Sequence, residues 1–354
     1  MARLDKWESK HLKDVERYAR QIEAIYQSAV REAAAIGATI PNFNPNKPFS
    51  FANYPSTKAR IEKLLQTLKT GISTVILNGI EAEWTLANNK NNELCNVVFG
   101  EYATKLSPEQ ARKYYNTNDK ACKAFTERKI GGLKLSDRVW RYTEQFKTEI
   151  EMGIDLGLRD GLSADEMSRT LRQYLQHPDK LFRRVRDQHG QLHLSQRAAV
   201  YHPGQGVYRS SYKNAPRLAA TETNIAYRTS DYTRWQQLDF VVGIEIRLSN
   251  NHTLNGRAFT DICDELAGRY PKNFKFTGWH PYCRCHAVVI LKTLEEINER
   301  IMLGQPLNGE SANKVSDVPP NFKEWRIRNH DRIQKATKNG TLPYFLKDNR
   351  QYAA

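Results

Sequence analysis

The stretch that decides how this chain folds runs from Ser249 to Ile290 and reads SNNHTLNGRAFTDICDELAGRYPKNFKFTGWHPYCRCHAVVI. It contains three of the five cysteines and three of the nine histidines of the chain: Cys263, Cys283, Cys285, His252, His280 and His286. Thiolate and imidazole groups are the ligands that zinc takes, four at a time, in tetrahedral structural sites. The segment is rich in Asn and Gly and has little apolar surface. A bound metal ion would therefore supply folding free energy that a hydrophobic core cannot.

The spacing of the cysteines leaves other interpretations open. Cys283 and Cys285 form C-x-C rather than the usual C-x-x-C, and Cys263 lies 20 positions before Cys283. Cys263 could instead be a small buried apolar residue, with the two later cysteines on one face of a strand. A disulfide is a further alternative. We favour zinc over the buried-thiol interpretation, and we favour it over a disulfide because nothing in the sequence indicates secretion.

The residues on either side of this stretch predict a small β-sheet. Residues 239–248 (DFVVGIEIRL) alternate apolar and polar side chains, which is typical of a strand that is buried on one face. Residues 286–291 (HAVVIL) predict a second strand. The two strands would frame the predicted metal site.

Most of the remaining sequence has the apolar periodicity of helices. The predicted fold class is therefore α+β and mostly α-helical, with long N-terminal helices followed by a small β-sheet and zinc-type subdomain. A polar break is expected at 88–92, a helix opening at Pro216, and a linker over 304–320. Helices are expected over 2–38, 57–89, 108–129, 136–157, 163–175, 216–238, 293–302 and 321–338.

The charge of the chain suggests a polyanionic partner. Its 354 residues include 54 Lys and Arg against 39 Asp and Glu, a net charge of +15. The charge is spread along the chain, so solubility alone is an alternative explanation. Residues 178–214 mix basic and aromatic side chains, which suits nucleic-acid contacts, although an arm that packs on a neighbouring subunit fits as well. The candidate nucleic-acid-binding residues are Arg183, Arg184, Arg186, Arg197, Arg209 and Lys213.

Membrane association is not expected. The N-terminus, MARLDKWESKHLKD, lacks the apolar segment of a signal peptide, and no run of about 18 apolar residues could span a bilayer. The odd number of cysteines fits a reducing compartment.

Two motifs resemble a known family. CDELAG at 263–268, followed by GWHPYCRC at 278–285, resembles the C-terminal signature of phage minor head proteins, the Mu F-like head morphogenesis family. That signature is C-x-x-C-x-x-L-x-G, a gap, and then H-P-x-C-R-C. Thr260 stands where the family often has its first cysteine, and His252 is a candidate for the vacant position. RLAATETNIAY at 217–227 resembles the R-x-A-x-T-E-T-N-like helix that precedes this segment in the family.

The resemblance implies a minor head (capsid) structural protein of a tailed phage or prophage. Such proteins associate with the portal or the procapsid interior and assist head morphogenesis and DNA packaging or delivery. The implied partners are portal and capsid proteins and double-stranded DNA, and the implied location is the virion, with the host cytoplasm during assembly. The implied zinc is structural, with Cys263, Cys283 and Cys285 and either His280 or His252 as ligands. The expected regions are a helical 1–130, a Mu F-like 131–292 with its Cys/His cluster at 252–286, and a C-terminal 293–354.

Three alternatives stand beside this interpretation. A zinc-supported nuclease would use His252 as general base, and a phage-delivered toxin would act on nucleic acid or nucleotides. The third possibility, a plain nucleic-acid-binding module, is also a property that a head protein can have. We expect no enzyme, because the sequence carries no paired carboxylates, Gly-rich phosphate loop or G-x-S-x-G motif. Glu222 falls on a buried helical stripe without a companion nucleophile, so no catalytic residue is predicted.

Overall fold

The computed structural model describes residues 5–47, 49–177, 185–186, 188–193, 208, 210–249, 253–254, 257–258, 260–303, 305 and 307–353. The chain forms two compact units. The sheet unit combines Met1–Asp14, Ile80–Phe125 and Thr221–Ala354, and the helical unit combines Val15–Gly79 and Thr126–Ala220. Each unit is thus assembled from separate segments of the chain, whereas the sequence suggested contiguous regions.

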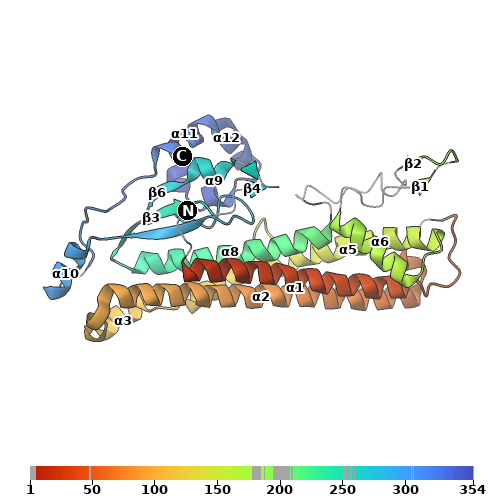
Figure 1. Cartoon of the computed structure of the whole chain (residues 1–354), viewed down its shortest axis with the longest axis horizontal. Coiled ribbons are helices and arrows are strands. Elements are labelled where there is room, and N and C mark those ends of the chain that lie inside the picture. Colours follow the sequence, from red (N-terminus) through yellow and green to blue (C-terminus); the bar gives the residue numbers. More distant parts are fainter. Residues whose placement is uncertain are drawn as a thin grey trace. The chain divides into compact units, whose positions relative to one another are not determined.

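Helices dominate the structure, and a small antiparallel sheet accompanies them (Figure 1), which confirms the predicted fold class. Among the described residues, none of the helices is both long and apolar enough to cross a membrane. The α-helices are α1 (Lys6–Gly37), α2 (Pro55–Phe99), α3 (Pro108–Tyr114), α4 (Asp119–Glu127), α5 (Leu135–Arg159), α6 (Ala164–Gln176), α8 (Ser211–Gln237), α9 (Ile262–Leu266), α10 (Leu294–Met302), α11 (Pro320–Arg328), α12 (His330–Lys338), α13 (Tyr344–Lys347) and α14 (Arg350–Ala353). Short 3₁₀ helices lie at Phe51–Asn53 and Gly100–Lys105.

The helical unit has a largely apolar core. Tyr26 of α1 meets Phe146 of α5 edge to face, with ring centroids 5.3 Å apart, and both side chains are fully buried. A capping box opens α6, since the Ser163 hydroxyl accepts from the Glu166 N–H and the Glu166 side chain accepts from the Ser163 N–H. A two-stranded hairpin pairs β1 (Val185–Arg186) with β2 (Leu192–His193).

The predicted break at 88–92 is wrong, because α2 runs without interruption to Phe99. Asn88 and Asn91 are buried, and each donates a side-chain hydrogen bond to the carbonyl one turn earlier. Asn91 also donates to Asp231 at 2.9 Å. Tertiary partners for the two amides thus outweigh the low helix propensity of asparagine.

Three other helix predictions need correction. Residues 108–129 form α3 and α4 rather than one helix, with Asn118 between them in a left-handed conformation (φ 56°). Residues 321–338 divide into α11 and α12 at Asn329. Helix α8 begins at Ser211, not Pro216, because the buried Glu149 carboxylate accepts the otherwise unpaired Ser211 N–H at 2.9 Å.

The sheet has the strand order β6–β3–β7 and is antiparallel throughout. Strands β3 (Val241–Arg247) and β7 (His286–Leu291) confirm the two predicted strands, and Ile244 of the central strand faces Tyr270 and Val289. The third strand, β6 (Gly268–Pro271), was not predicted, because its four residues are too few to show alternation. A separate two-stranded hairpin pairs β4 (Thr253–Leu254) with β5 (Arg257–Ala258).

An aromatic core lies beneath the sheet and anchors the C-terminal helices. Tyr270 meets Phe274 and Phe322, and Trp279 meets Phe345 edge to face with centroids 5.2 Å apart. The described part of 304–320 is attached to this unit rather than being a free linker. The Val315 N–H donates to the Val242 carbonyl at 3.2 Å.

Candidate metal centre

The first part of the centre is the start of α9. The Asp261 carboxylate accepts from the Cys263 N–H at 2.8 Å, and the Asp264 carboxylate accepts from the Asp261 N–H at 2.8 Å. This capping box fixes the backbone of the first helical turn. Cys263, in that turn, is thereby held in place, and its side chain is buried.

The second part is a tight turn between His280 and Cys283. The Cys283 N–H donates to the His280 carbonyl at 3.1 Å, with Pro281 and Tyr282 between them. Tyr282 has φ 63°, and a proline followed by a positive φ is the pattern of a type II turn. Gly278, just before the turn, has φ 118°, and a Cβ there would lie 3.0 Å from the Cys283 Cβ. The turn brings His280 and Cys283 to one side of the loop.

The two parts meet at the thiols. The Cys263 Sγ lies 3.8 Å from the Cys283 Sγ and 3.3 Å from the His280 Nε2. The sulfur atoms of Cys263, Cys283 and Cys285 all lie within 4.8 Å of one another, and all three residues are buried. These residues form a group that could hold a metal ion.

The orientation of the His280 ring suits this role. Its Nδ1 lies 3.0 Å from the Pro281 carbonyl, which is an acceptor, so Nδ1 carries the hydrogen. The lone pair is then on Nε2, the atom that faces Cys263. A backbone carbonyl on the other ring nitrogen is the usual partner of a metal-bound histidine.

The three thiols strongly affect one another's protonation. Hydrogen bonds from Cys263 and Cys285 hold the pKa of Cys283 well below its usual range, and a backbone hydrogen bond at Trp279 acts in the same direction. The hydrogen bonds to Cys283 and Cys285, together with burial, raise the pKa of Cys263. A cation in the centre would bind the sulfurs as thiolates and displace the thiol protons.

Asp261 is a further candidate ligand that the sequence analysis missed. Its carboxylate, the Cys263 thiol and His280 form a second group within 4.8 Å, and its Oδ2 lies 3.6 Å from the His280 Nε2. The available signal was an N-capping aspartate two residues before a cysteine. His286 lies at the start of β7 and is not part of either group, while His252 lies outside the described residues.

Two side chains of α8 fasten the candidate metal-binding loop, residues 277–285, to the rest of the sheet unit. Asn224 donates to the Thr277 carbonyl at 3.4 Å, and its own carbonyl lies 2.9 Å from the His11 Nε2. Arg228 donates to the Cys285 carbonyl at 3.4 Å. It also makes a bidentate pair with Glu8, at 2.6 and 2.7 Å. Asn224 and Arg228 thus connect the first turns of α1 to the backbone carbonyls of Thr277 and Cys285.

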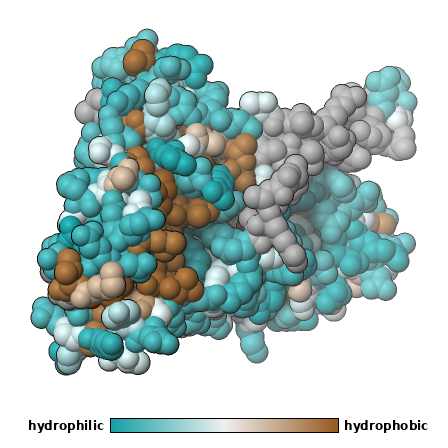
Figure 2. Space-filling view, turned by 60° about the vertical axis from the view of Figure 1, so that its left-hand side comes forward, coloured by the Kyte–Doolittle hydropathy of each residue, from teal (hydrophilic) through white to brown (hydrophobic). Residues whose placement is uncertain are grey.

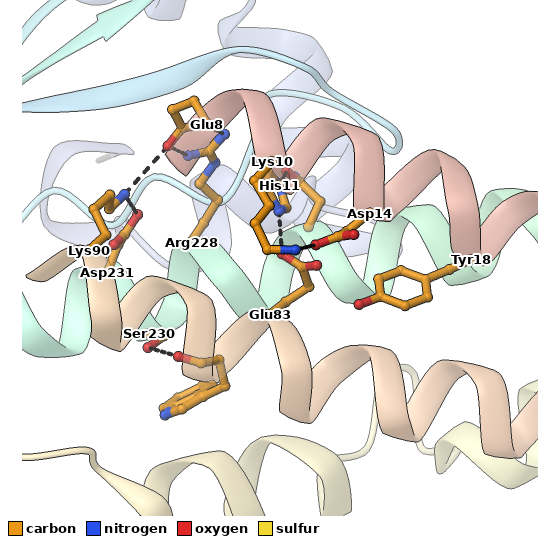
Figure 3. Close-up of polar contacts among 12 residues, drawn as sticks. Glu8, Lys10, His11, Asp14, Tyr18, Glu83, Lys90, Arg228, Ser230 and Asp231 are labelled. Atoms are coloured by element: carbon orange, nitrogen blue, oxygen red, sulfur yellow. Dashed lines mark hydrogen bonds and ion pairs between the residues drawn. The ribbon is translucent and has the colours of Figure 1, made fainter. Parts of the chain in front are cut away.

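A buried polar network continues from these contacts (Figure 3). Lys90 bridges Glu8 and Asp231, at 3.4 and 2.5 Å. Burial alone would raise the pKa of Glu8, but the positive charges of Arg228 and Lys90 outweigh it and hold that pKa far below its ordinary value. Burial raises the pKa of Asp231, although Lys90 opposes the shift.

Both ring nitrogens of His11 face acceptors, with Glu83 at 2.6 Å and Asn224 at 2.9 Å. The His11 ring also stacks on Tyr227, with centroids 4.0 Å apart. The sequence of α8 marks the helix but does not predict its partners in α1.

The predicted nucleic-acid-binding residues stay a prediction. Arg183, Arg184, Arg197 and Arg209 lie outside the described residues. The backbone of Arg186 belongs to β1, and Lys213 is half-buried in the first turn of α8.

Comparison with known proteins gave no relative, since no family model, curated protein or solved structure matches this chain.

Proposed function

We propose that the cysteine cluster is a structural zinc site with Cys263, Cys283, Cys285 and His280 as its four ligands. Zinc bonds of about 2.3 Å to sulfur and about 2.0 Å to nitrogen, arranged tetrahedrally, place two sulfurs about 3.8 Å apart and sulfur and nitrogen about 3.5 Å apart. The corresponding distances are 3.8 Å for Cys263 to Cys283 and 3.3 Å for Cys263 to His280. Three thiols and one imidazole are a soft donor set, which suits zinc rather than magnesium or calcium.

The completeness of this ligand set favours a structural role. A catalytic zinc keeps one position for water or substrate and has three protein ligands, whereas a structural zinc has four. The three buried thiols lie within 4.8 Å of one another, and His280, whose Nε2 lies 3.3 Å from the Cys263 Sγ, is the fourth ligand that we propose. A nuclease that depends on zinc-bound water would need one of these ligands to leave.

We further propose that the protein is a minor head structural protein of a tailed phage or prophage. The support comes from the two motifs that resemble that family, at 217–227 and 263–285. Asn224 of the first motif and the neighbouring Arg228 donate hydrogen bonds to carbonyls of the second, at Thr277 and Cys285. A helix that holds the metal-binding loop gives the joint occurrence of the two motifs a physical reason. In this role the zinc fixes a surface that assembles with portal or capsid proteins.

Quantitative mass spectrometry of particles, purified from cells that carry the neighbouring genes, tests the proposal. We expect the protein at a few to a few tens of copies beside the portal and major capsid proteins. Cys283→Ser should lower its incorporation, while Cys122→Ser, which removes a half-buried thiol of α4, should not. A protein that is abundant in the cell but absent from particles contradicts the proposal and moves the nuclease and toxin alternatives forward.

Metal analysis of the purified protein tests the site separately. One zinc per chain is expected, and Cys283→Ser should lose it. A wild-type protein that binds no zinc under reducing conditions would exclude the site without deciding the place of the protein in the particle.

A further inference from the structure

Helix α10 displays an apolar surface that its own unit does not cover. Thr293 caps the helix, and Ile297 is buried. On the exposed side, Leu294 and Met302 lie two turns apart and are 74% and 72% exposed, and Leu303, directly after the helix, is 62% exposed. Figure 2 turns the side of Figure 1 that carries α10 toward the viewer, and brown apolar surface gathers there among the hydrophilic surface.

Acidic side chains border this apolar surface. Glu295 and Glu299 lie one turn apart on α10, and both are exposed. An exposed helix with an apolar stripe and a charged border is the kind of element that inserts into an apolar groove of a partner. Its acidic border requires a groove with a basic edge.

The same unit carries a groove of this kind at α11 and α12. The groove has a volume of about 680 Å³. Trp279, Trp325 and Phe345 contribute aromatic surface to its lining, and Ile262, Ile333 and Ala336 contribute aliphatic surface.

The charged edge of the groove is basic. Arg328, Arg332, His280 and Glu265 line it, so two guanidinium groups stand against one carboxylate. Arg328 pairs with Glu265 at 2.8 Å, and Arg332 donates to Asn329 at 3.2 Å, so both guanidinium groups are held near the groove. Both arginines are exposed. The groove thus matches α10 both in its apolar lining and in the sign of its charge.

We propose that α10 of one copy of this chain docks in the α11–α12 groove of a second copy. Leu294, Met302 and Leu303 would enter the groove, and Glu295 and Glu299 would face Arg328 and Arg332. The two surfaces differ, and we propose a head-to-tail contact in which the two copies do not dock reciprocally. Each docked copy leaves one α10 and one groove open, and growth continues until the subunits close a ring or form a filament.

A nine-residue helix buries less surface than the roughly 1,200–2,000 Å² of a stable protein–protein interface. A single contact is therefore weak, and association depends on protein concentration. Closure of a ring would strengthen it, because the last contact forms within one assembly.

Sedimentation velocity of the full-length, metal-loaded chain over a range of concentrations tests the proposal. The wild type should form species larger than a dimer as its concentration rises. The triple variant Leu294→Gln, Met302→Gln and Leu303→Gln removes the apolar stripe without altering charge and should stay monomeric. All three positions are exposed, so circular dichroism and the thermal midpoint should be unchanged.

A groove variant is expected to have the same effect. Arg332→Glu with Ala336→Glu places carboxylates where Glu295 and Glu299 would dock, so it should also be monomeric. The matched control is Gln334→Glu with Lys338→Glu. These exposed positions lie on the same helix, do not line the groove and change the net charge by the same three units. The control should assemble like the wild type.

Mixing the two monomeric variants distinguishes docking from general stickiness. The α10 variant keeps an intact groove, and the groove variant keeps an intact α10. An equimolar mixture should therefore form a one-to-one heterodimer and nothing larger. A wild type that stays monomeric at all concentrations overturns the proposal. So does assembly that survives in the α10 variant, is lost in the charge-matched control, or fails to reappear as a heterodimer in the mixture.

Discussion

The cysteine cluster (Cys263, Cys283 and Cys285) and the Glu8 network (Glu8, Lys90, Arg228 and Asp231) both contain buried polar groups. The two differ in what can balance their charges. The network contains two carboxylates, Glu8 and Asp231, and two cations, Arg228 and Lys90, so its charges balance within the chain. The described contacts of the three thiols involve one another, His280 and backbone groups. If the thiols lost their protons, no Lys or Arg among these contacts would balance the negative charge of the thiolates.

The difference indicates which of the two buried polar sites is the candidate for a bound metal ion. A self-neutralised network is complete when the chain folds, and its cost is the desolvation of its charges. A group of soft donors without a balancing cation is completed by a metal ion, whose binding free energy becomes folding free energy. The two sites meet at Arg228, which holds Glu8 and the Cys285 carbonyl at once.

Removing the metal should have the largest effect. Structural zinc contributes roughly 10 kcal/mol or more in small zinc domains. We expect a strong chelator, or Cys283→Ser, to lower the thermal midpoint steeply and to expose Trp279 and its aromatic neighbours. Tryptophan fluorescence and calorimetry would measure this. Cys122→Ser should behave like the wild type. Equal stability of the metal-free and metal-loaded proteins would contradict the comparison.

Breaking the Glu8 network should cause the second-largest loss of stability. Glu8→Gln leaves the buried Arg228 charge without its carboxylate, and removing one partner of a buried pair costs about 3–5 kcal/mol. Urea unfolding at neutral pH would measure the loss. Glu310→Gln, at an exposed pair with Lys314, is the control and should leave the unfolding midpoint unchanged. A small effect for Glu8→Gln would mean that water reaches the network.

Removing the contact of Asn224 with the metal-binding loop should have a smaller effect, on the affinity for zinc. Asn224→Ala removes the hydrogen bond to the Thr277 carbonyl, and lost support of a metal-binding loop typically lowers affinity by about 10–100-fold. Competition with a chromophoric chelator would measure the affinity for zinc. Asn91→Ala is the matched control, since Asn91 bonds Asp231 but not the metal-binding loop. An equal loss in both variants would show that general loosening, not the link, sets the affinity.

The smallest expected effect is on the pH dependence of stability. The folded-state pKa of Glu8 is lowered below its ordinary value of 4.5, so its contribution is fully present above about pH 4.5. It is lost as the pH falls from there toward the folded-state pKa. The stability difference between the wild type and Glu8→Gln should therefore shrink below pH 4.5, because protonated Glu8 resembles glutamine. A difference that stays constant down to pH 3 would show that Glu8 does not titrate with unfolding.

Local patterns predicted the local parts of this structure. The capping boxes at Ser163 and Thr293 and the strands at 241–247 and 286–291 are encoded in residues a few positions apart. The concentration of cysteines similarly pointed to the group of thiols that could hold a metal ion. Where local propensity conflicted with distant contacts, as for Asn88 and Asn91 in α2, the prediction failed.

By itself, the sequence determined the helix periodicity, the two main strands and the set of soft ligands at 263–285. Only the tertiary structure decided that His280 and Asp261 lie beside Cys263, and that α8 carries Arg228 to Glu8, 220 positions earlier in the chain. The physical reason is that a side chain's hydrogen bonds and charge partners are chosen in space. Spacing along the chain encodes helices, strands and turns, but a buried pair between distant helices exists only once the core has brought them together.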